Sequence, residues 1–215
     1  MSITYLKNFF GDKHVGSVTP TSKGCVKRIC DRMNLRDSDV VVEFGPGGGV
    51  FTRHILGQLG PEAKLIAIEN NEDFHKELTS SKELQDPRVE LVLGSAADAV
   101  NIFKDLGMDK ADYIISGIPF AFLDGPLKRE IIAAAAGILK NGGYFYTYQF
   151  FPPVYKKGEK LSKYISEELE LKGKYFELPN IPPLYIYEAI KNGASSENGV
   201  VPQASPEMMS ESLEG

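Results

Sequence analysis

From about residue 37 onward, short apolar runs alternate with segments whose apolar residues recur every three to four positions. The apolar runs are continuous Val, Ile, Leu and aromatic stretches, which is typical of parallel strands covered on both faces. The predicted strands are DVVVEFG, AKLIAIE, RVELVLG, ADYIISG and YFYTYQF. The predicted helices are FTRHILGQL, EDFHKELTSS, AADAVNIFKDLG and PLKREIIAAAAGILK, the last one ended by Asn141-Gly142-Gly143. This alternation predicts a doubly wound α/β sheet with right-handed crossovers.

The C-terminal third departs from this alternation. KYFELPN and PPLYIYEAI are strand-like runs with no helix between them, which predicts an antiparallel pair at the sheet edge. With them, the fold class is a mostly parallel seven-stranded sheet with an antiparallel edge strand. Residues 191–215 are rich in Ser, Glu, Gly and Pro, so we expect a disordered tail there. The α/β domain is therefore expected over 37–190.

Residues 1–36 are expected to form a separate amphipathic, helical segment. Its first part has one apolar face, with Lys7 outside that face. The residues of the apolar face are Ile3, Leu6, Phe9 and Phe10. A second helix is predicted over 20–34, with Thr19 as its N-cap and Pro20 at its first position. Its buried side consists of Val26, Ile29, Cys30 and Met33.

Composition agrees with one soluble globular domain: 215 residues, 42% hydrophobic and 25% charged. No apolar run approaches the roughly 18 residues of a transmembrane helix, and the N-terminus lacks the apolar core and cleavage site of a signal peptide. We interpret the two cysteines, Cys25 and Cys30, as reduced and buried, which is typical of a cytoplasmic protein.

The charge is unevenly spread. The net charge is −5, yet residues 1–36 carry seven Lys or Arg against two Asp. An acidic body with a basic end argues against a broad nucleic-acid groove. It suits one basic surface that faces a small anionic target or an anionic membrane, although a solvated basic helix explains the same residues equally well.

A glycine-rich stretch, GPGGG, follows the first predicted strand and opens a helix. A phosphate-binding loop would end in Gly-Lys-Ser/Thr, where this chain has Gly49-Val50-Phe51. The dinucleotide pattern G-x-G-x-x-G is also incomplete, because Val50 takes the place of its third glycine. These two classes of nucleotide site are therefore disfavoured.

Acidic residues beside the loop suggest a different ligand. A carboxylate at Glu43 can meet a cationic amine, while glycine amides at a helix start can meet a carboxylate, so the loop suits an amino acid. Glu69, at the end of the second strand, can accept hydrogen bonds from a ribose diol. An amino acid joined to a nucleoside without phosphate is S-adenosylmethionine.

These stretches resemble the motifs of class I S-adenosylmethionine-dependent methyltransferases. VVEFGPGGGVFT resembles the first motif, AIEN the second and LGSAAD the third. SGIPF is similar to the fourth motif of rRNA adenine dimethylases and of bacterial phospholipid N-methyltransferases. FFGDKHVGSVTPTSKG and LPNIPPLYIYE resemble the phospholipid branch more closely, and the whole resemblance covers about residues 5–190.

The resemblance implies a Rossmann-like methyltransferase fold with S-adenosyl-L-methionine as cofactor. The cofactor-binding residues it implies are Glu43, Gly45, Pro46, Gly47, Gly48, Gly49, Glu69, Asn70, Ser95, Ala96 and Ser116. Two positions depart from the pattern. Gly48 stands where many relatives have Thr, which removes a side chain but leaves the amide. Ser95 stands where many have an Asp against the adenine amino group, so either Asp98 takes that place or Ser95 and Ala96 hold adenine through backbone and apolar contacts.

The methyl group of a sulfonium is already activated, so the protein mainly positions the acceptor and excludes water. The predicted catalytic loop consists of Ser116, Gly117, Ile118, Pro119 and Phe120. Its backbone carbonyls could accept N–H bonds from an amine, and Phe120 could pack on that amine; an ordinary turn containing Pro and Phe is the alternative. For the substrate we name His14 as the one candidate base, and Tyr148 and Phe151 as aromatic partners of a quaternary ammonium. No metal is expected.

The leading functional hypothesis is an N-methyltransferase that converts phosphatidylethanolamine and its mono- and dimethyl forms towards phosphatidylcholine. It would lie in the cytoplasm at the inner face of the membrane, bound through the apolar face of residues 1–12. Further contact with anionic lipid would come from Lys156, Lys157, Lys160 and Lys163, although these also suit a solvated helix face.

Three other functions stay open. An rRNA adenine dimethylase or other RNA methyltransferase is permitted by SGIPF, since an aromatic ring can stack on a flipped base. The acidic body, Ser116 in place of the usual Asn or Asp, and the lack of room for a helical C-terminal domain argue against RNA as partner. A small-amine methyltransferase, with the N-terminal segment as a lid, and a cofactor-binding protein without catalysis are the others.

Overall fold

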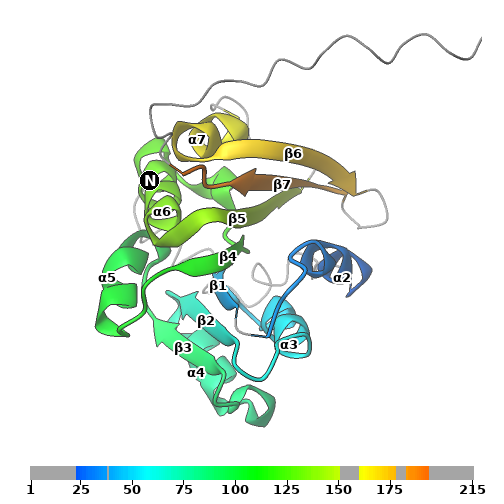
Figure 1. The fold of residues 1–215 in the computed structure, drawn as a ribbon, viewed down its shortest axis with the longest axis vertical. Helices are drawn as coiled ribbons and strands as arrows, with labels where there is room; N and C mark the ends of the chain where they lie inside the picture. Colours follow the sequence, from blue (N-terminus) through cyan, green and yellow to red (C-terminus); the bar gives the residue numbers. More distant parts are fainter. Residues whose placement is uncertain (1–22, 38, 151–159, 178–182, 194–215) are drawn as a thin grey trace, which may run out of the picture.

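The computed structural model describes residues 23–37, 39–150, 160–177 and 183–193 (Figure 1). They form a seven-stranded sheet in the order β3-β2-β1-β4-β5-β7-β6. The strands are β1 (Val40–Phe44), β2 (Lys64–Glu69), β3 (Val89–Leu93), β4 (Ala111–Ser116), β5 (Leu139–Phe150), β6 (Glu170–Glu177) and β7 (Leu184–Ile190). Neighbours among β1 to β5 pair in parallel, whereas β7 is antiparallel to both β5 and β6. The predicted Rossmann-like methyltransferase fold is confirmed.

Helices cover both faces of the sheet, as the alternating pattern predicts. The α-helices are α2 (Lys23–Asp31), α3 (Val50–Leu56), α4 (Glu72–Ser80), α5 (Ala99–Asp105), α6 (Gly125–Ile138) and α7 (Leu161–Glu168). Short 3-10 helices are η1 (Lys82–Leu84), η2 (Ala96–Asp98) and η3 (Phe120–Phe122). Apolar residues of α2, α3 and α4 form one core cluster with one face of the sheet, and those of α5, α6 and α7 form the other.

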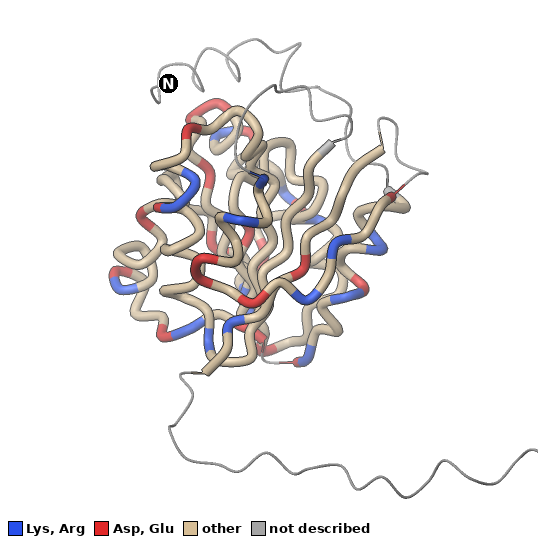
Figure 2. Tube along the Cα trace, turned by 90° about the horizontal axis from the view of Figure 1, so that it is seen from above, with Lys and Arg blue, Asp and Glu red and all other residues tan. Residues whose placement is uncertain are grey.

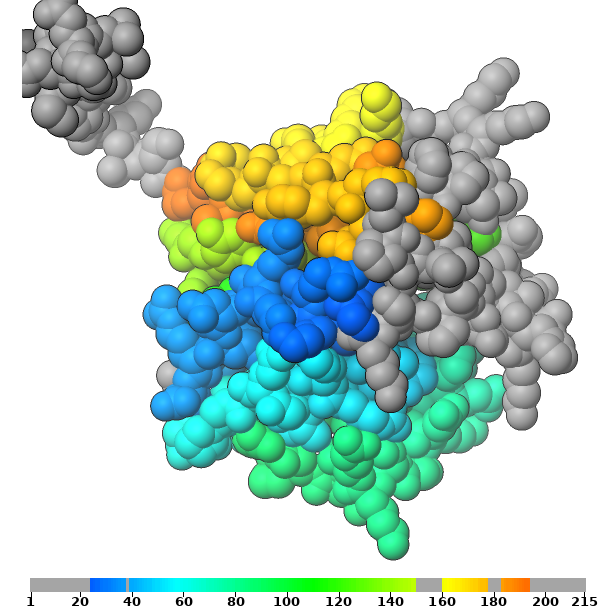
Figure 3. All heavy atoms as spheres, turned by 90° about the vertical axis from the view of Figure 1, so that its right-hand side faces the viewer, coloured from blue at the N-terminus to red at the C-terminus, as the bar shows by residue number. Residues whose placement is uncertain are grey.

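Helix α2, at the start of the described residues, contacts the strands near their C-terminal end. It lies between α3 and the β6–β7 pair (Figure 3), and its Arg28 forms an ion pair with Glu177 of β6, at 2.6 Å. The predicted apolar side of this helix and the turn after it is buried at Val26, Ile29, Cys30 and Met33. Cys25 and Cys30 are both buried, and neither forms a disulfide. The predicted cap at Thr19 and Pro20, and the apolar face of residues 1–12, lie outside the described residues.

The C-terminal strand pair refines the predicted edge. The antiparallel pairing of β6 with β7 is confirmed, but β7 is inserted between β5 and β6, so β6 is the outermost strand. Along β6 the side chains alternate strictly between exposed and half-buried positions. This period of two is what a strand covered on one face requires.

The predicted end of the fourth helix at Asn141-Gly142-Gly143 is wrong. Helix α6 ends at Ile138, and β5 begins at Leu139, which is fully buried and pairs with Ala111 of β4. Gly142, with φ +80°, lies in an irregular stretch of that strand, where its N–H donates to the Lys191 carbonyl at 2.7 Å. Burial of Leu139 therefore takes the chain into the sheet before the glycines are reached.

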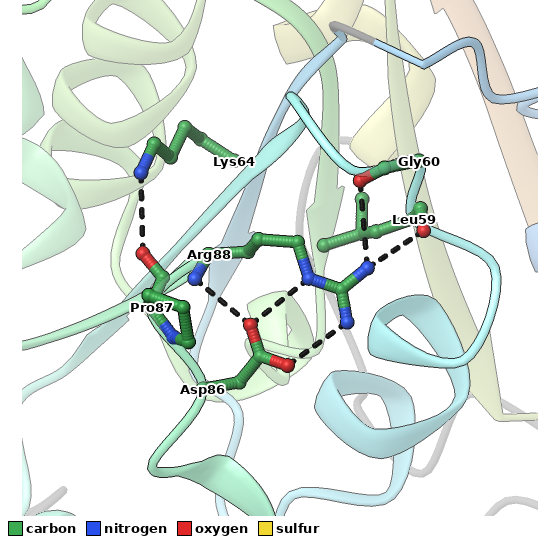
Figure 4. Close-up of polar contacts among 6 residues, drawn as sticks. All are labelled: Leu59, Gly60, Lys64, Asp86, Pro87 and Arg88. Atoms are coloured by element: carbon green, nitrogen blue, oxygen red, sulfur yellow. Dashed lines mark hydrogen bonds and ion pairs between the residues drawn. The ribbon is translucent and has the colours of Figure 1, made fainter.

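A cluster of polar contacts lies at the amino ends of β2 and β3 (Figure 4). The Arg88 guanidinium donates to both oxygens of Asp86, at 2.9 Å each, and to the Leu59 carbonyl at 2.8 Å. The hydrogen bonds from Arg88 hold the pKa of Asp86 down to about 2. This ion pair ties the loop after α3 to the start of β3.

Charge is mixed over the surface. Lys and Arg are interspersed with Asp and Glu around the described body (Figure 2). Within the described ranges, no helix combines the length and apolar character needed to cross a bilayer.

Candidate active site

A cavity of about 180 Å³ lies at the carboxyl ends of the central strands. In the sheet, β1 has β2 on one side and β4 on the other, so the strand order reverses at this point. Ligands of open α/β sheets bind at such a switch point. The cavity is lined by Gly45, Gly47, Ile68, Glu69, Asn70, Asn71, Phe74, Gly94, Ser95, Ala96, Gly117, Ile118, Pro119, Leu123, Leu127 and Ile131. It thus brings together residues from the loops after β1, β2, β3 and β4.

The glycines after β1 are required by the backbone. Gly45, Gly47 and Gly49 have φ of +67°, +54° and +75°, a region that residues with a side chain rarely adopt. A Cβ on Gly45 would also lie 3.1 Å from Cγ1 of Ile118, in the loop after β4. Gly48 has no positive φ, and a Cβ there would meet nothing within 4 Å. A side chain at position 48 is therefore compatible with this loop.

Glu69 lies at the cavity wall and holds two loops. It is 5% exposed; its Oε2 accepts the Gly47 N–H at 2.9 Å and its Oε1 accepts the Asn71 N–H at 2.9 Å. Burial raises the pKa of Glu69, and these backbone N–H groups lower it in part. Each carboxylate oxygen has a second lone pair, so both can still accept a hydroxyl from a ligand.

Glu43 is buried behind the glycine loop and does not line the cavity. It is 2% exposed, and no described residue forms a hydrogen bond with its Oε2 or with Oγ1 of Thr52. Burial raises the pKa of Glu43 to about 8. Pro46, Gly48 and Gly49 are likewise absent from the cavity lining. A direct contact between Glu43 and a ligand amine stays a prediction.

The loop after β4 is held against the glycine loop. The Gly117 N–H donates to the Phe44 carbonyl at 2.8 Å, and a Cβ on Gly117 would lie 2.8 Å from the Gly45 carbonyl oxygen. The Ser116 carbonyl accepts the Thr147 hydroxyl at 3.2 Å, and the Ile118 carbonyl accepts the Phe120 N–H at 2.9 Å.

The Gly117 carbonyl differs from the others in this loop, because no described residue donates a hydrogen bond to it. Ser116 is 1% exposed and does not line the cavity, whereas Gly117, Ile118 and Pro119 do. The structure places Phe120 in the core, at 2% exposure, rather than at the cavity. The expected packing of its ring on an acceptor is corrected, because η3 turns the ring inward.

Comparisons with known proteins agree with this geometry. A family model described as ribosomal RNA adenine dimethylase matches residues 12–106. The curated ornithine lipid N-methyltransferase of Singulisphaera acidiphila is 26% identical over 186 residues, which cover 85% of this chain and 92% of that protein.

Among solved structures, TrmN from Thermus thermophilus superposes with a TM-score of 0.61 and 13% identity, covering 82% of this chain and 51% of TrmN. This chain thus spans about half the length of TrmN. Fibrillarin from Aeropyrum pernix, solved with natively bound S-adenosyl-L-methionine, superposes with a TM-score of 0.59 and 16% identity, covering 72% of this chain and 67% of fibrillarin. The chain is a class I S-adenosylmethionine-dependent methyltransferase.

The cavity of this methyltransferase suits its cofactor. S-adenosylmethionine carries a zwitterion, a ribose and an adenine, and the cavity offers backbone of a glycine loop, one buried carboxylate and apolar walls. Among the described residues that line it, there is no lysine or arginine to bind a phosphate. That donor set fits a nucleoside without phosphate, as the sequence predicts.

The two alternatives for adenine binding at the third motif involve Ser95 and Asp98, which lie differently relative to the cavity. The Ser95 hydroxyl accepts the Ala97 N–H at 3.2 Å and so begins η2, while Ser95 and Ala96 both line the cavity. Asp98 does not line it, and its carboxylate accepts a hydrogen bond from Asn101 at 2.5 Å. Adenine binding through Ser95 and Ala96 stays a prediction, and these two residues are the ones that border the cavity.

Several residues of the methyltransferase cavity were not singled out from the sequence. These are Ile68, Asn71, Phe74, Gly94, Leu123, Leu127 and Ile131. Leu127 and Ile131 stand four apart on α6, a spacing that indicates one apolar helix face. The spacing does not tell whether such a helix face borders a cavity or packs in the core. The position of α6 beside η2 in the structure does.

The three predicted substrate residues have different outcomes. Tyr148 stacks on Phe51 of α3, with 5.6 Å between ring centroids. Its hydroxyl lies 3.6 Å from the place a Cβ would take on Gly117, so it borders the predicted catalytic loop. His14 and Phe151 lie outside the described residues.

Proposed function

We propose that this methyltransferase methylates the amine of a lipid head group, taking phosphatidylethanolamine and its partly methylated forms towards phosphatidylcholine. The observation that carries the proposal is the similarity to ornithine lipid N-methyltransferase, which extends over 92% of that protein. A match of that extent runs well beyond the cofactor motifs, which supports a similar class of acceptor. An amine-bearing lipid is the acceptor class common to this relative and to the phospholipid branch that the sequence resembles.

For the cofactor, we propose that Glu69 accepts the ribose hydroxyls and that the backbone of the glycine loop meets the methionine part. Ser95 and Ala96 would hold the adenine, with Phe74, Leu127 and other apolar residues of the wall around it. When bound, the cofactor supplies a methyl group on a positively charged sulfur. The apolar walls keep water from that group.

For the acceptor, we propose that the Gly117 carbonyl accepts an N–H of the amine and that Tyr148 borders the same position. Glu69 is the one titratable side chain in the cavity lining formed by described residues, and both its oxygens are engaged by backbone N–H groups. A general base is therefore not part of this proposal. The amine enters neutral, and the aromatic ring of Tyr148 attracts the positively charged product.

A second candidate is methylation of adenine in RNA, which is favoured by the family model that matches residues 12–106. That range contains the cofactor loops, which both functions need. The mixed charge of the described surface and the net charge of −5 weigh against an RNA groove.

The test is a parallel transfer assay with purified full-length protein and S-adenosylmethionine labelled in the methyl group. The acceptors are vesicles of phosphatidylethanolamine with phosphatidylglycerol, vesicles with ornithine lipid, total RNA, and free ethanolamine. We expect label in the lipid fraction and none above background in RNA. Label in RNA, or in free ethanolamine at the same rate as in vesicles, would overturn the lipid proposal.

A further inference from the structure

Arg53 of α3 joins the glycine loop to the segment after α4. Its Nη1 donates to the Gly48 carbonyl at 2.7 Å, and its Nε donates to Oε2 of Glu83 in η1 at 3.0 Å. Its Nη2 lies 3.5 Å from Oγ of Ser81. One side chain thus contacts three points that are up to 35 positions apart along the chain.

The glycine loop has little else to hold it. Its three consecutive glycines, 47–49, have no side chains to pack, and a glycine chain has more conformations to lose than any other. Within the described residues, side-chain atoms bond this stretch at two places: Glu69 accepts the Gly47 N–H, and Arg53 donates to the Gly48 carbonyl. Two backbone bonds add to these: the Gly49 N–H donates to the Pro46 carbonyl at 2.9 Å, and the Arg53 N–H donates to the Gly49 carbonyl at 3.1 Å.

The Arg53 guanidinium passes close to Gly49, where a side chain would collide with it. A Cβ on Gly49 would lie 2.7 Å from Nη1 of Arg53 and 2.7 Å from Cδ2 of Leu78. Gly49 therefore has two reasons to be glycine: its φ of +75°, and the guanidinium that passes beside it. Gly48, whose carbonyl the guanidinium binds, has open space around its Cα.

We propose that Arg53 is a positioning residue for the cofactor: it holds the glycine loop in its binding conformation, and Glu83 acts through it. Arg53 does not line the cavity, and it bonds the Gly48 carbonyl, whereas Glu69 in the cavity wall bonds the Gly47 N–H. When a loop occupies its competent conformation only part of the time, apparent affinity falls by that fraction. The inference rests on the proposed cofactor site and is independent of the acceptor.

The test measures the Kd of S-adenosylhomocysteine by calorimetry for Arg53→Gln, Arg53→Lys and Glu83→Gln. We expect Arg53→Gln to weaken binding about tenfold, which is the scale of one charge-assisted hydrogen bond. Arg53→Lys should recover part of this loss, because an ammonium can still donate to the Gly48 carbonyl. Saturating cofactor should restore kcat, so that KM for the cofactor rises while kcat changes little.

The double variant tests the relay. If Glu83 acts only by orienting Arg53, Glu83→Gln should weaken binding about two- to threefold in the wild-type background and not at all beside Arg53→Gln. Arg32→Gln is the matched control, because Arg32 is also 34% exposed and also forms an ion pair, with Glu188, away from the loop. It should leave the Kd unchanged.

Three results would overturn the proposal. The first is a Kd for Arg53→Gln within twofold of wild type, and the second is an equal loss for Arg32→Gln. The third is an undiminished effect of Glu83→Gln beside Arg53→Gln. Should Arg53→Gln fail to fold, Arg53→Lys and the exposed Glu83→Gln are tested instead, and each should raise KM for the cofactor while kcat changes little. Absence of S-adenosylhomocysteine binding by the wild-type protein would count against the cofactor site itself. That outcome distinguishes a wrong cofactor site from a wrong role for Arg53.

Discussion

At the residue scale, the acids near the carboxyl ends of β1 and β2 differ in their partners. Both oxygens of Glu69 accept backbone N–H groups, while Oε2 of Glu43 accepts no hydrogen bond from the described residues. A buried carboxylate with an unpartnered oxygen is costly, so burial favours the neutral acid. Burial accordingly raises the pKa of Glu43 to about 8. Burial thus shifts the pKa of Glu43 into the range where a change of pH alters its charge.

This shift makes stability depend on pH. Because the pKa of Glu43 is higher in the folded state than in the unfolded chain, its contribution is full below about pH 4.5 and is lost as the pH rises through about 8. We expect Glu43→Gln, which cannot ionise, to lose less stability than wild type between pH 5 and about 8.5. The measurement is Tm by calorimetry at several pH values, with exposed Glu90→Gln as control. Parallel Tm curves for wild type and Glu43→Gln would contradict it.

At the scale of elements, the glycine loop offers a matched pair of substitutions. Gly45→Ala places a Cβ at φ +67° and 3.1 Å from Ile118, whereas Gly48→Ala places one in open space without a positive φ. The strain at Gly45 is of the order of 1–2 kcal/mol, so we expect a roughly tenfold rise in the Kd of S-adenosylhomocysteine. Gly48→Ala should bind as wild type does. Equal affinities of the two variants in calorimetry would show that the loop tolerates either side chain.

Elements were predictable where one physical signal dominates. Continuous apolar runs such as that of β1 and the period of two in β6 each have one structural solution. The end of α6 was not predictable, because a glycine pair is a common helix end and the competing signal, burial of Leu139 against Ala111, is a tertiary contact. Phe120 was misplaced for the same reason: an aromatic after Pro is equally suited to a cavity and to a core.

The same limit applies to the site. Glu69, Gly45 and Gly47 of the cavity lining were singled out from the sequence because strand-end acids and glycine-rich turns leave local signatures. Leu127 and Ile131 were missed because a helix face shows the same spacing whether it borders a cavity or a core. Arg53 gave no signal either, since its three contacts come together only after α3, the loop and η1 have packed.

At the scale of the whole molecule, the cofactor cavity depends on loops that follow four strands of one sheet. Residues after β1, β2, β3 and β4 meet there because parallel strands end at one edge. The described residues thus supply loops from four strands to this cavity. How the protein would reach the proposed lipid acceptor is a separate question, and the sequence analysis predicts that residues 1–12, which lie outside the described residues, provide the membrane contact.

Deletion of residues 1–12 tests that assignment. The segment combines four large apolar residues on one predicted face with Lys7, a composition that suits an interfacial helix. We expect the truncated enzyme to bind S-adenosylhomocysteine as before and to lose co-sedimentation with vesicles of phosphatidylethanolamine and phosphatidylglycerol. Deletion of residues 194–215, at the other end, is the control and should leave vesicle binding intact.

The two interpretations of this segment predict different kinetics. If residues 1–12 anchor the enzyme to the bilayer, their deletion slows transfer to vesicles, while transfer to the same lipid dispersed in detergent micelles continues, because a micellar acceptor no longer requires docking on a membrane. If they form a lid over the cavity, both reactions slow together, since loss of the lid admits water to the site whatever carries the acceptor. Unchanged sedimentation with vesicles would exclude the anchor, and a parallel fall in both rates would then favour the lid.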